Sequence, residues 1–185
     1  MSRATPTVAT ALRTCLLLAA ACAGVLKAAD YVPSMLAGTP HDARVYWTLA
    51  EAEAGIGRAI WVPSAYPLSV AWPPARIDEW PIPPRAVAVH FDSRSGAKDV
   101  LILVESLDGE TPPPPALLPP VETLMTVPDV PLGRRSGTMA RETRSGGHVL
   151  HDLWWTQGGR RIVMRYTGSV EDLLLMAGSL ERGHP

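Results

Sequence analysis

The feature that most constrains this chain is a pair of glycines, Gly158 and Gly159, between two runs of residues typical of β-strands. Tight turns between antiparallel strands need positive φ angles, which glycine adopts without steric cost. The sequence therefore predicts a β-hairpin over residues 151–166. Its register should pair Trp155 with Ile162, Leu153 with Met164 and His151 with Tyr166 on one face, and Trp154 with Val163 and Asp152 with Arg165 on the other.

The leucine-rich segment after this hairpin is predicted to be a helix. Ser169 is suited to cap it, and Asp172 stands three positions later, as in a capping box. Its apolar residues recur with helical spacing and should form one stripe buried against the sheet, made of Val170, Leu173, Leu174, Ala177 and Leu180.

A second, shorter helix is expected over residues 48–57. Thr48 can accept a hydrogen bond from the N–H of Glu51, and the Glu51 side chain can reach back. Gly55 and Gly57 should stop this helix.

The 19 prolines exclude long helices from most of the chain, because each internal proline removes a backbone donor. Residues 111–131 are predicted to be a stiff surface loop, with a strand at 121–127 or a docking motif for a partner as alternatives. Residues 66–84 should be extended and irregular, which places Asp78 and Glu79 in a loop.

Three further segments have the patterns of strands. Residues 86–91 alternate, and residues 99–106 are apolar on both faces, so the second should be a central strand paired with the first. Residues 138–143 are polar enough for an edge strand. The predicted fold class is α+β, with a curved antiparallel sheet of about five or six strands packed on the C-terminal helix and a short N-terminal helix.

The N-terminal residues 1–29 have the form of an export signal or membrane anchor, which leaves 30–185 as a single α+β domain. Residues 15–26 form an apolar run that is short for a membrane span. The triplet Ala21-Cys22-Ala23 fits a signal-peptidase site, and the residues before Cys22 resemble a lipobox, which makes Cys22 a lipidation candidate. The chain is therefore expected outside the cytoplasm, either secreted, lipid-anchored or held by an uncleaved N-terminal segment, with a cytoplasmic N-terminal helix as the alternative.

Two blocks, residues 48–67 and 153–180, resemble an uncharacterised extracytoplasmic domain of Gram-positive bacteria, found downstream of anti-sigma-factor anchors and in small lipoproteins. The matching positions are Glu51, Ala52, Gly57, Pro63, Trp155, Gly159, Gly168, Glu171, Ala177, Ser179 and Leu180. The chain is more distantly similar to the lipoprotein-carrier and sigma-factor-regulator fold, an open antiparallel sheet curled around a helix. The resemblance implies a binding or sensing domain, and it brings no catalytic residues with it.

No residue pattern in the chain indicates catalysis, a cofactor or a metal. There is no G-x-S-x-G, P-loop or dinucleotide glycine motif. His148 and His151 lie three apart on an expected strand and should point to opposite faces, so they are not expected to share a metal. His90 is expected to be a packed or exposed side chain and no part of an active site.

The chain has six tryptophans and one phenylalanine. Most of the tryptophans are expected to fill the core. Trp72 and Trp80, in the proline-rich stretch, are predicted to rim an apolar groove that could take a lipid, a glycan or a partner peptide.

These observations together predict a non-catalytic extracytoplasmic binding or sensing domain at the cell envelope, with regulation as one role. Its partner would be an envelope protein or a hydrophobic ligand, and the N-terminus could associate with the membrane. A net charge of −1 without a basic stripe does not favour nucleic acid. The alternatives are a carrier of a lipid or other hydrophobic ligand in a sheet–helix cavity, and an uncharacterised hydrolase.

Overall fold

The computed structural model describes residues 43–118, 123–143 and 149–182. The predicted export signal and Cys22 lie outside these ranges. The elements, in chain order, are β1 (Arg44–Tyr46), α2 (Leu49–Ile56), β2 (Trp61–Pro63), β3 (Arg76–Trp80), β4 (Ala86–Phe91), β5 (Leu101–Ser106), β6 (Thr123–Leu132), β7 (Arg135–Thr143), β8 (Val149–Gln157), β9 (Arg160–Tyr166), α3 (Val170–Gly178) and β10 (Leu180–Arg182).

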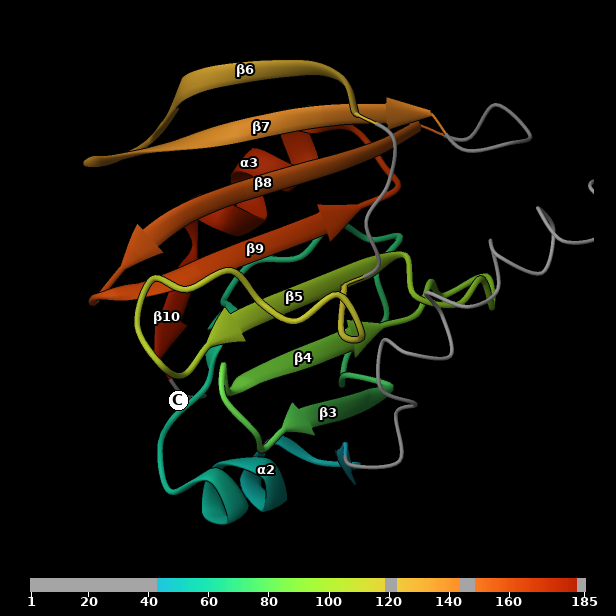
Figure 1. Ribbon diagram of the computed structural model, residues 1–185. Helices are drawn as coiled ribbons and strands as arrows, with labels where there is room; N and C mark the ends of the chain where they lie inside the picture. Colours follow the sequence, from blue (N-terminus) through green and yellow to red (C-terminus); the bar gives the residue numbers. More distant parts are fainter. Residues whose placement is uncertain (1–42, 119–122, 144–148, 183–185) are drawn as a thin grey trace, which may run out of the picture. The chain divides into compact units, whose positions relative to one another are not determined.

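Eight of the strands form one open antiparallel sheet, in the order β1-β3-β4-β5-β9-β8-β7-β6 (Figure 1). A separate ladder pairs β10 with β2. The fold is therefore an antiparallel sheet with two short helices, as predicted in outline, but the expected five or six strands are too few.

The additional strands come from segments where prolines suggested irregular structure. Strand β3 lies between proline pairs, since Pro73 and Pro74 precede it and Pro83 and Pro84 follow it. Strand β6 contains Pro128 and Pro131, and it occupies the second half of the predicted loop at 111–131. It is the edge strand and pairs with β7 alone, so a proline there need not break a ladder hydrogen bond.

The β8–β9 hairpin has the predicted register. Trp155 pairs with Ile162, and Asp152 pairs with Arg165. Gly158 and Gly159 have φ angles of 59° and 74°, as a primed turn requires. The β4–β5 hairpin also forms as predicted, and β5 is central, with β4 on one side and β9 on the other.

Both predicted helices form, with small differences at their ends. The Ser169 hydroxyl accepts the N–H of Asp172 at 3.1 Å and caps α3. The buried stripe of α3 consists of Leu173, Met176 and Ala177, whereas Leu180 already belongs to β10.

Helix α2 is capped by Thr48, which accepts the N–H of Glu51 at 3.2 Å, and it ends at Gly57 with a φ of 79°. The prediction that Gly55 also stops it is wrong, because Gly55 lies within the helix. A Cβ atom at Gly55 would stand 2.5 Å from the hydroxyl of Tyr46, so the glycine allows a close approach to β1.

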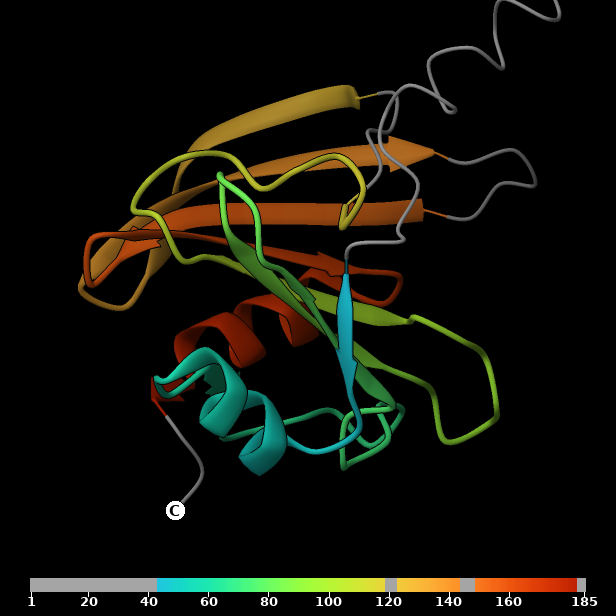
Figure 2. The same cartoon turned by 60° about the horizontal axis from the view of Figure 1, so that its bottom comes forward.

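The two faces of the sheet have different covers (Figure 2). Helices α2 and α3 lie on one, here called the inner face, and the proline strap, residues 107–118, crosses the other, the outer face. The inner face holds the larger core, which includes Phe91, Leu103, Leu153, Met164 and Leu173. The outer face holds a smaller cluster, in which Leu117 of the strap packs with Ala86, Ala88, Val104 and Val163.

Two carboxylates are buried among the inner-face residues. Glu79, which the sequence placed in a loop, lies in β3 and accepts the hydroxyl of Tyr46 at 2.8 Å. Glu105 accepts the N–H of Trp61 at 3.1 Å and pairs with Arg160. Burial raises the pKa of the Glu105 carboxyl despite these two partners. Both acids hold inner-face loops and strands together.

His151 is another titratable side chain that the sheet buries near the helix layer, and it is 8% exposed. Its Nδ1 donates to the carbonyl of Gly168 at 3.1 Å, just before α3. Burial lowers the pKa of the imidazole, although the Gly168 carbonyl opposes that shift. The folded state therefore favours neutral His151.

We expect His151 to make the protein less stable in mild acid. Because its folded pKa lies below the unfolded value of about 6.5, its stabilisation is complete above that pH and is lost as the pH falls towards the folded pKa. Urea unfolding between about pH 7.5 and 5 measures the slope. His151→Asn, whose amide can still donate to Gly168, should flatten it, and an unchanged slope would contradict this account.

Candidate functional site

The outer face contains a cluster of charged side chains around His90 of β4. Its Nδ1 lies 2.9 Å from Oδ1 of Asp99, and its Nε2 lies 3.2 Å from Oδ2 of Asp78. Arg76 lies 3.2 Å from Asp78 and 3.9 Å from Asp99. Asp99 has a φ of 50° just before β5, an uncommon conformation that turns the chain at this cluster.

The cluster lines a polar pocket of about 360 Å³. Burial would raise the pKa of Asp78, but the hydrogen bond and charge of His90, together with Arg76, hold it below its usual value. Both ring nitrogens of His90 lie close to carboxylates, although Nε2 makes no hydrogen bond of good geometry within the described residues. Oδ1 of Asp78 is buried and has no hydrogen-bond partner in the described part of the chain, so it could accept a hydrogen bond from a ligand.

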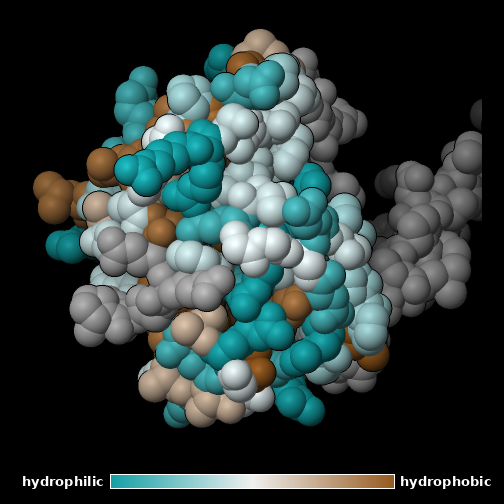
Figure 3. Space-filling model, turned by 90° about the vertical axis from the view of Figure 1, so that its left-hand side faces the viewer, coloured by the Kyte–Doolittle hydropathy of each residue, from teal (hydrophilic) through white to brown (hydrophobic). Residues whose placement is uncertain are grey.

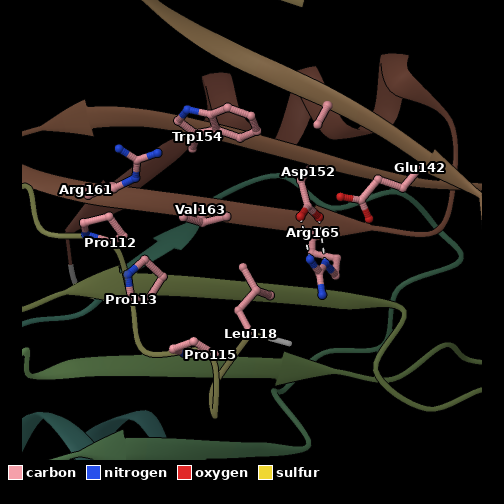
Figure 4. Close-up of a pocket in the computed structure, with 11 residues that line it drawn as sticks. Pro112, Pro113, Pro115, Leu118, Glu142, Asp152, Trp154, Arg161, Val163 and Arg165 are labelled. Carbon is pink, nitrogen blue, oxygen red and sulfur yellow. Dashed lines mark hydrogen bonds and ion pairs between the residues drawn. The ribbon is translucent and has the colours of Figure 1, made fainter. Parts of the chain in front are cut away.

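A second cavity, the proline groove, runs between the proline strap and strands β7 to β9 (Figure 4). It has a volume of about 330 Å³. The strap contributes Pro112, Pro113, Pro115 and Leu118, and the sheet contributes Ala140, Glu142, Asp152, Trp154, Arg161, Val163 and Arg165.

The charged floor of this groove is the ion pair predicted from the hairpin register. Arg165 donates from Nε and Nη2 to the two oxygens of Asp152, at 2.7 and 2.6 Å. Both side chains are buried, since Asp152 is 7% exposed and Arg165 3%. The strap and the neighbouring strands exclude water from the pair, which makes it much harder to break than an exposed one.

The third cavity, the aromatic groove, lies between the start of α2 and residues 72–74. It has a volume of about 420 Å³ and is lined by Trp47, Thr48, Leu49, Ala50, Glu53, Trp72, Pro73 and Pro74. Trp47 is 68% exposed and Trp72 39%. The Trp72 ring is held by Tyr66 and Phe91, at centroid distances of 5.3 and 6.2 Å.

A polar hollow of about 370 Å³ shares Trp47 with the aromatic groove. Its other lining residues are Ala75, Arg76, Asp92, Lys98 and Asp99. Lys98 lies 2.5 Å from Asp92, and this contact lowers the pKa of Asp92. Trp47 therefore has an apolar groove on one side and a charged, hydrogen-bonding surface on the other.

The two tryptophans predicted to rim one groove pack in different clusters. Trp72 lines the aromatic groove. Trp80 packs against the smaller cluster of the outer face. The second aromatic wall of the aromatic groove is Trp47, which sequence reasoning did not single out.

The remaining histidines considered as site residues lie away from these cavities or outside the described residues. His151 contacts the helix side of the sheet, and His148 lies outside the described residues. Within residues 43–118, 123–143 and 149–182, no three histidine, cysteine or acidic side chains converge as metal ligands do. Neither described helix is long and apolar enough to cross a membrane.

Sequence reasoning also missed Asp99, Arg76 and Arg161 as site residues. An aspartate next to a glycine-containing turn is a weak signal for Asp99. A signal for Arg161 was also present, because the hairpin register places it on the same face as Asp152 and Trp154. The strap that makes this face a groove could not be placed from sequence.

No family model matches this chain, and neither a curated protein nor a solved structure is significantly similar to it.

We expect Asp152→Ala to lower the free energy of unfolding by about 3–5 kcal/mol, because Arg165 would stay buried without its Asp152 partner. The double variant Asp152→Leu, Arg165→Met should recover much of that loss. Urea unfolding at neutral pH measures both.

Lys98→Ala is the matched control, since it breaks an ion pair whose lysine is 79% exposed. It should cost less than about 1 kcal/mol. Similar losses of unfolding free energy in Asp152→Ala and Lys98→Ala would show that the buried pair contributes no more stability than the exposed one.

Proposed function

We propose that this chain is a non-catalytic binding or sensing domain on the extracytoplasmic side of the cell envelope, and that it binds its ligand in the aromatic groove. The observation that carries the proposal is the exposure of Trp47, 68%, beside Trp72 in a groove of about 420 Å³. Large aromatic side chains left open to solvent in a concave site mark places where a ligand completes the burial. Regulation through the bound ligand is the role that the family resemblance suggests.

The surroundings of Trp47 favour a saccharide as the ligand. Sugar rings have an apolar C–H face that can lie on an indole ring, and their edges carry hydroxyl groups. The polar hollow beside Trp47 offers both kinds of hydrogen-bonding group, with carboxylates at Asp92 and Asp99 and cations at Arg76 and Lys98. A purely apolar ligand would use only the aromatic groove.

The surface pattern also favours a local groove over a broad apolar interface. On the side of the molecule in Figure 3, hydrophobic residues form separate spots among hydrophilic ones. The apolar lining of the aromatic groove consists of two tryptophans, two prolines, Leu49 and Ala50.

The carrier alternative has less support. A carrier in the lipoprotein-carrier manner needs space between sheet and helix for its ligand. Here Leu173, Met176 and Ala177 of α3 are fully buried against the inner face, so side chains fill that space. A hydrolase has less support as well, because both ring nitrogens of His90 already contact carboxylates.

We expect Trp47→Ala to weaken binding of chito-oligosaccharides of about three to six units by about tenfold or more, since losing one well-used aromatic surface costs about 1.4 kcal/mol or more. The NMR signal of the Trp47 indole N–H and calorimetric titration report the binding. Leu68→Ala, at a side chain 84% exposed outside the groove, is the control and should bind like the wild type.

Equal affinity in the wild type and Trp47→Ala, or no binding of these saccharides by the wild type, would contradict the saccharide assignment. Dodecanoate is the second probe. If it binds and the saccharides do not, the ligand class is hydrophobic and the carrier alternative takes precedence.

The envelope location can be tested separately by mass spectrometry of the protein isolated from its own cells. We expect an N-terminus at Gly24, after signal-peptidase cleavage, or a lipid-modified Cys22. An unprocessed chain in the membrane fraction would fit the anchor alternative. An unprocessed chain in the cytosolic fraction would contradict an extracytoplasmic role.

A further inference from the structure

The guanidinium of Arg161 of β9 lines the proline groove and has no carboxylate partner among the described residues. The ion pairs found within the described residues involve Arg44, Arg76, Arg85, Arg160 and Arg165, and none includes Arg161. Its Nε is buried without a hydrogen-bond partner in the same part of the chain. A buried donor of this kind costs stability unless something accepts its hydrogen bond.

The Arg161 side chain is nevertheless held in place. Its guanidinium carbon lies 5.9 Å from the centre of the Trp154 ring, a cation–π arrangement. Its backbone N–H donates to the carbonyl of Gly109 in the proline strap at 3.0 Å. The cation is therefore positioned at the mouth of the proline groove, where it can meet a ligand without much loss of side-chain freedom.

The proline groove has opposite charges at its two ends. Figure 4 shows Arg161 beside Pro112 and Trp154 at one end, and Glu142 beside the Asp152–Arg165 pair at the other. Between them the lining is apolar, with Val163 on the sheet and Pro113 on the strap. A ligand that matches this pattern carries an anion at one end only, next to an apolar stretch.

The walls of the groove are themselves extended chain segments. The strap contributes consecutive prolines from 112 to 115, whose fixed φ angles keep that wall stiff, and strands β8 and β9 form the opposite wall. A groove between such walls fits an extended peptide, and a stiff wall loses little entropy when the peptide binds.

We propose that the proline groove is a second binding site, for an extended, mainly apolar peptide segment of a partner protein whose carboxylate pairs with Arg161. Arginine suits this role because its planar guanidinium can donate two parallel hydrogen bonds to one carboxylate. Trp154 and the strap prolines bury the apolar part of the segment. The site lies on the outer face, and it does not depend on the aromatic groove or on a saccharide ligand.

The test uses two acetylated and amidated pentapeptides, APVLE and APVLQ, which differ only in the charge of the last side chain. Binding is followed at low ionic strength through the NMR signal of the Trp154 indole N–H. The glutamate peptide should bind the wild type at least about fivefold more tightly than the glutamine peptide, as expected for one charge-assisted hydrogen-bonded pair at a partly exposed site. In Arg161→Gln the two peptides should bind equally.

Arg134→Gln is the matched control, because Arg134 lies in the β6–β7 turn outside the groove lining and is exposed. It should keep the difference between the peptides. Trp154→Leu lacks the indole reporter and is measured by calorimetric titration. It should weaken both peptides and reduce the preference for the glutamate peptide, because it also removes the ring that holds Arg161. The unfolding midpoint of each variant shows whether it is folded.

Three outcomes would overturn the proposal. One is a wild type that binds neither peptide, and another is equal affinity for the two peptides in the wild type. The third is a charge preference that survives in Arg161→Gln. Decanoate is added as a last probe, and if it binds through Arg161 while the peptides do not, the groove takes small anionic amphiphiles and the peptide assignment is wrong.

Discussion

The β8–β9 pairing is the constraint on which the other features of this structure depend. A shift of one strand by one residue would move all its side chains to the opposite face of the sheet. In the observed register, Leu153, Trp155 and Met164 face the helices, and Trp154, Asp152 and Arg165 face the strap. The primed turn at Gly158 and Gly159 permits this register, and the apolar inner core on one side stabilises it.

The same sheet thus separates two kinds of surface. Its inner face is closed by large apolar side chains from α3 and carries buried acids that tie loops to strands, as Glu105 does for Trp61. Its outer face is covered only in part, by a strap without regular structure, so charged groups there are buried by proline and leucine side chains instead of by a helix. Because the strap covers the outer face only in part, grooves remain beside it. The aromatic groove likewise lies between two segments, the loop at 72–74 and the start of α2.

Local patterns predicted a good part of the fold, for reasons that are themselves local. The glycine pair and the capping residues Thr48 and Ser169 act within a few positions of the chain, so the hairpin and both helix starts were correctly placed. Prolines favoured irregular structure over strands β3 and β6, so β3 was not predicted and β6 was predicted only as the alternative strand at 121–127. Prolines at the ends of β3, and on the outward side of an edge strand, do not oppose pairing, and only the position of a strand in the sheet decides which case applies.

The sequence by itself determined the register of the last hairpin, the caps of both helices and the central place of β5, because turn chemistry and side-chain periodicity require no knowledge of distant residues. Tertiary structure alone decided what those residues do together. The cluster of Asp78, His90 and Asp99 joins two strands and a turn. Trp47 and Trp72 line the same groove. The strap covers one face of the hairpin and so forms the groove that Arg161 lines. These residues become neighbours only through the strand order and the path of the loop across the sheet. Contacts between residues far apart in the chain determine both.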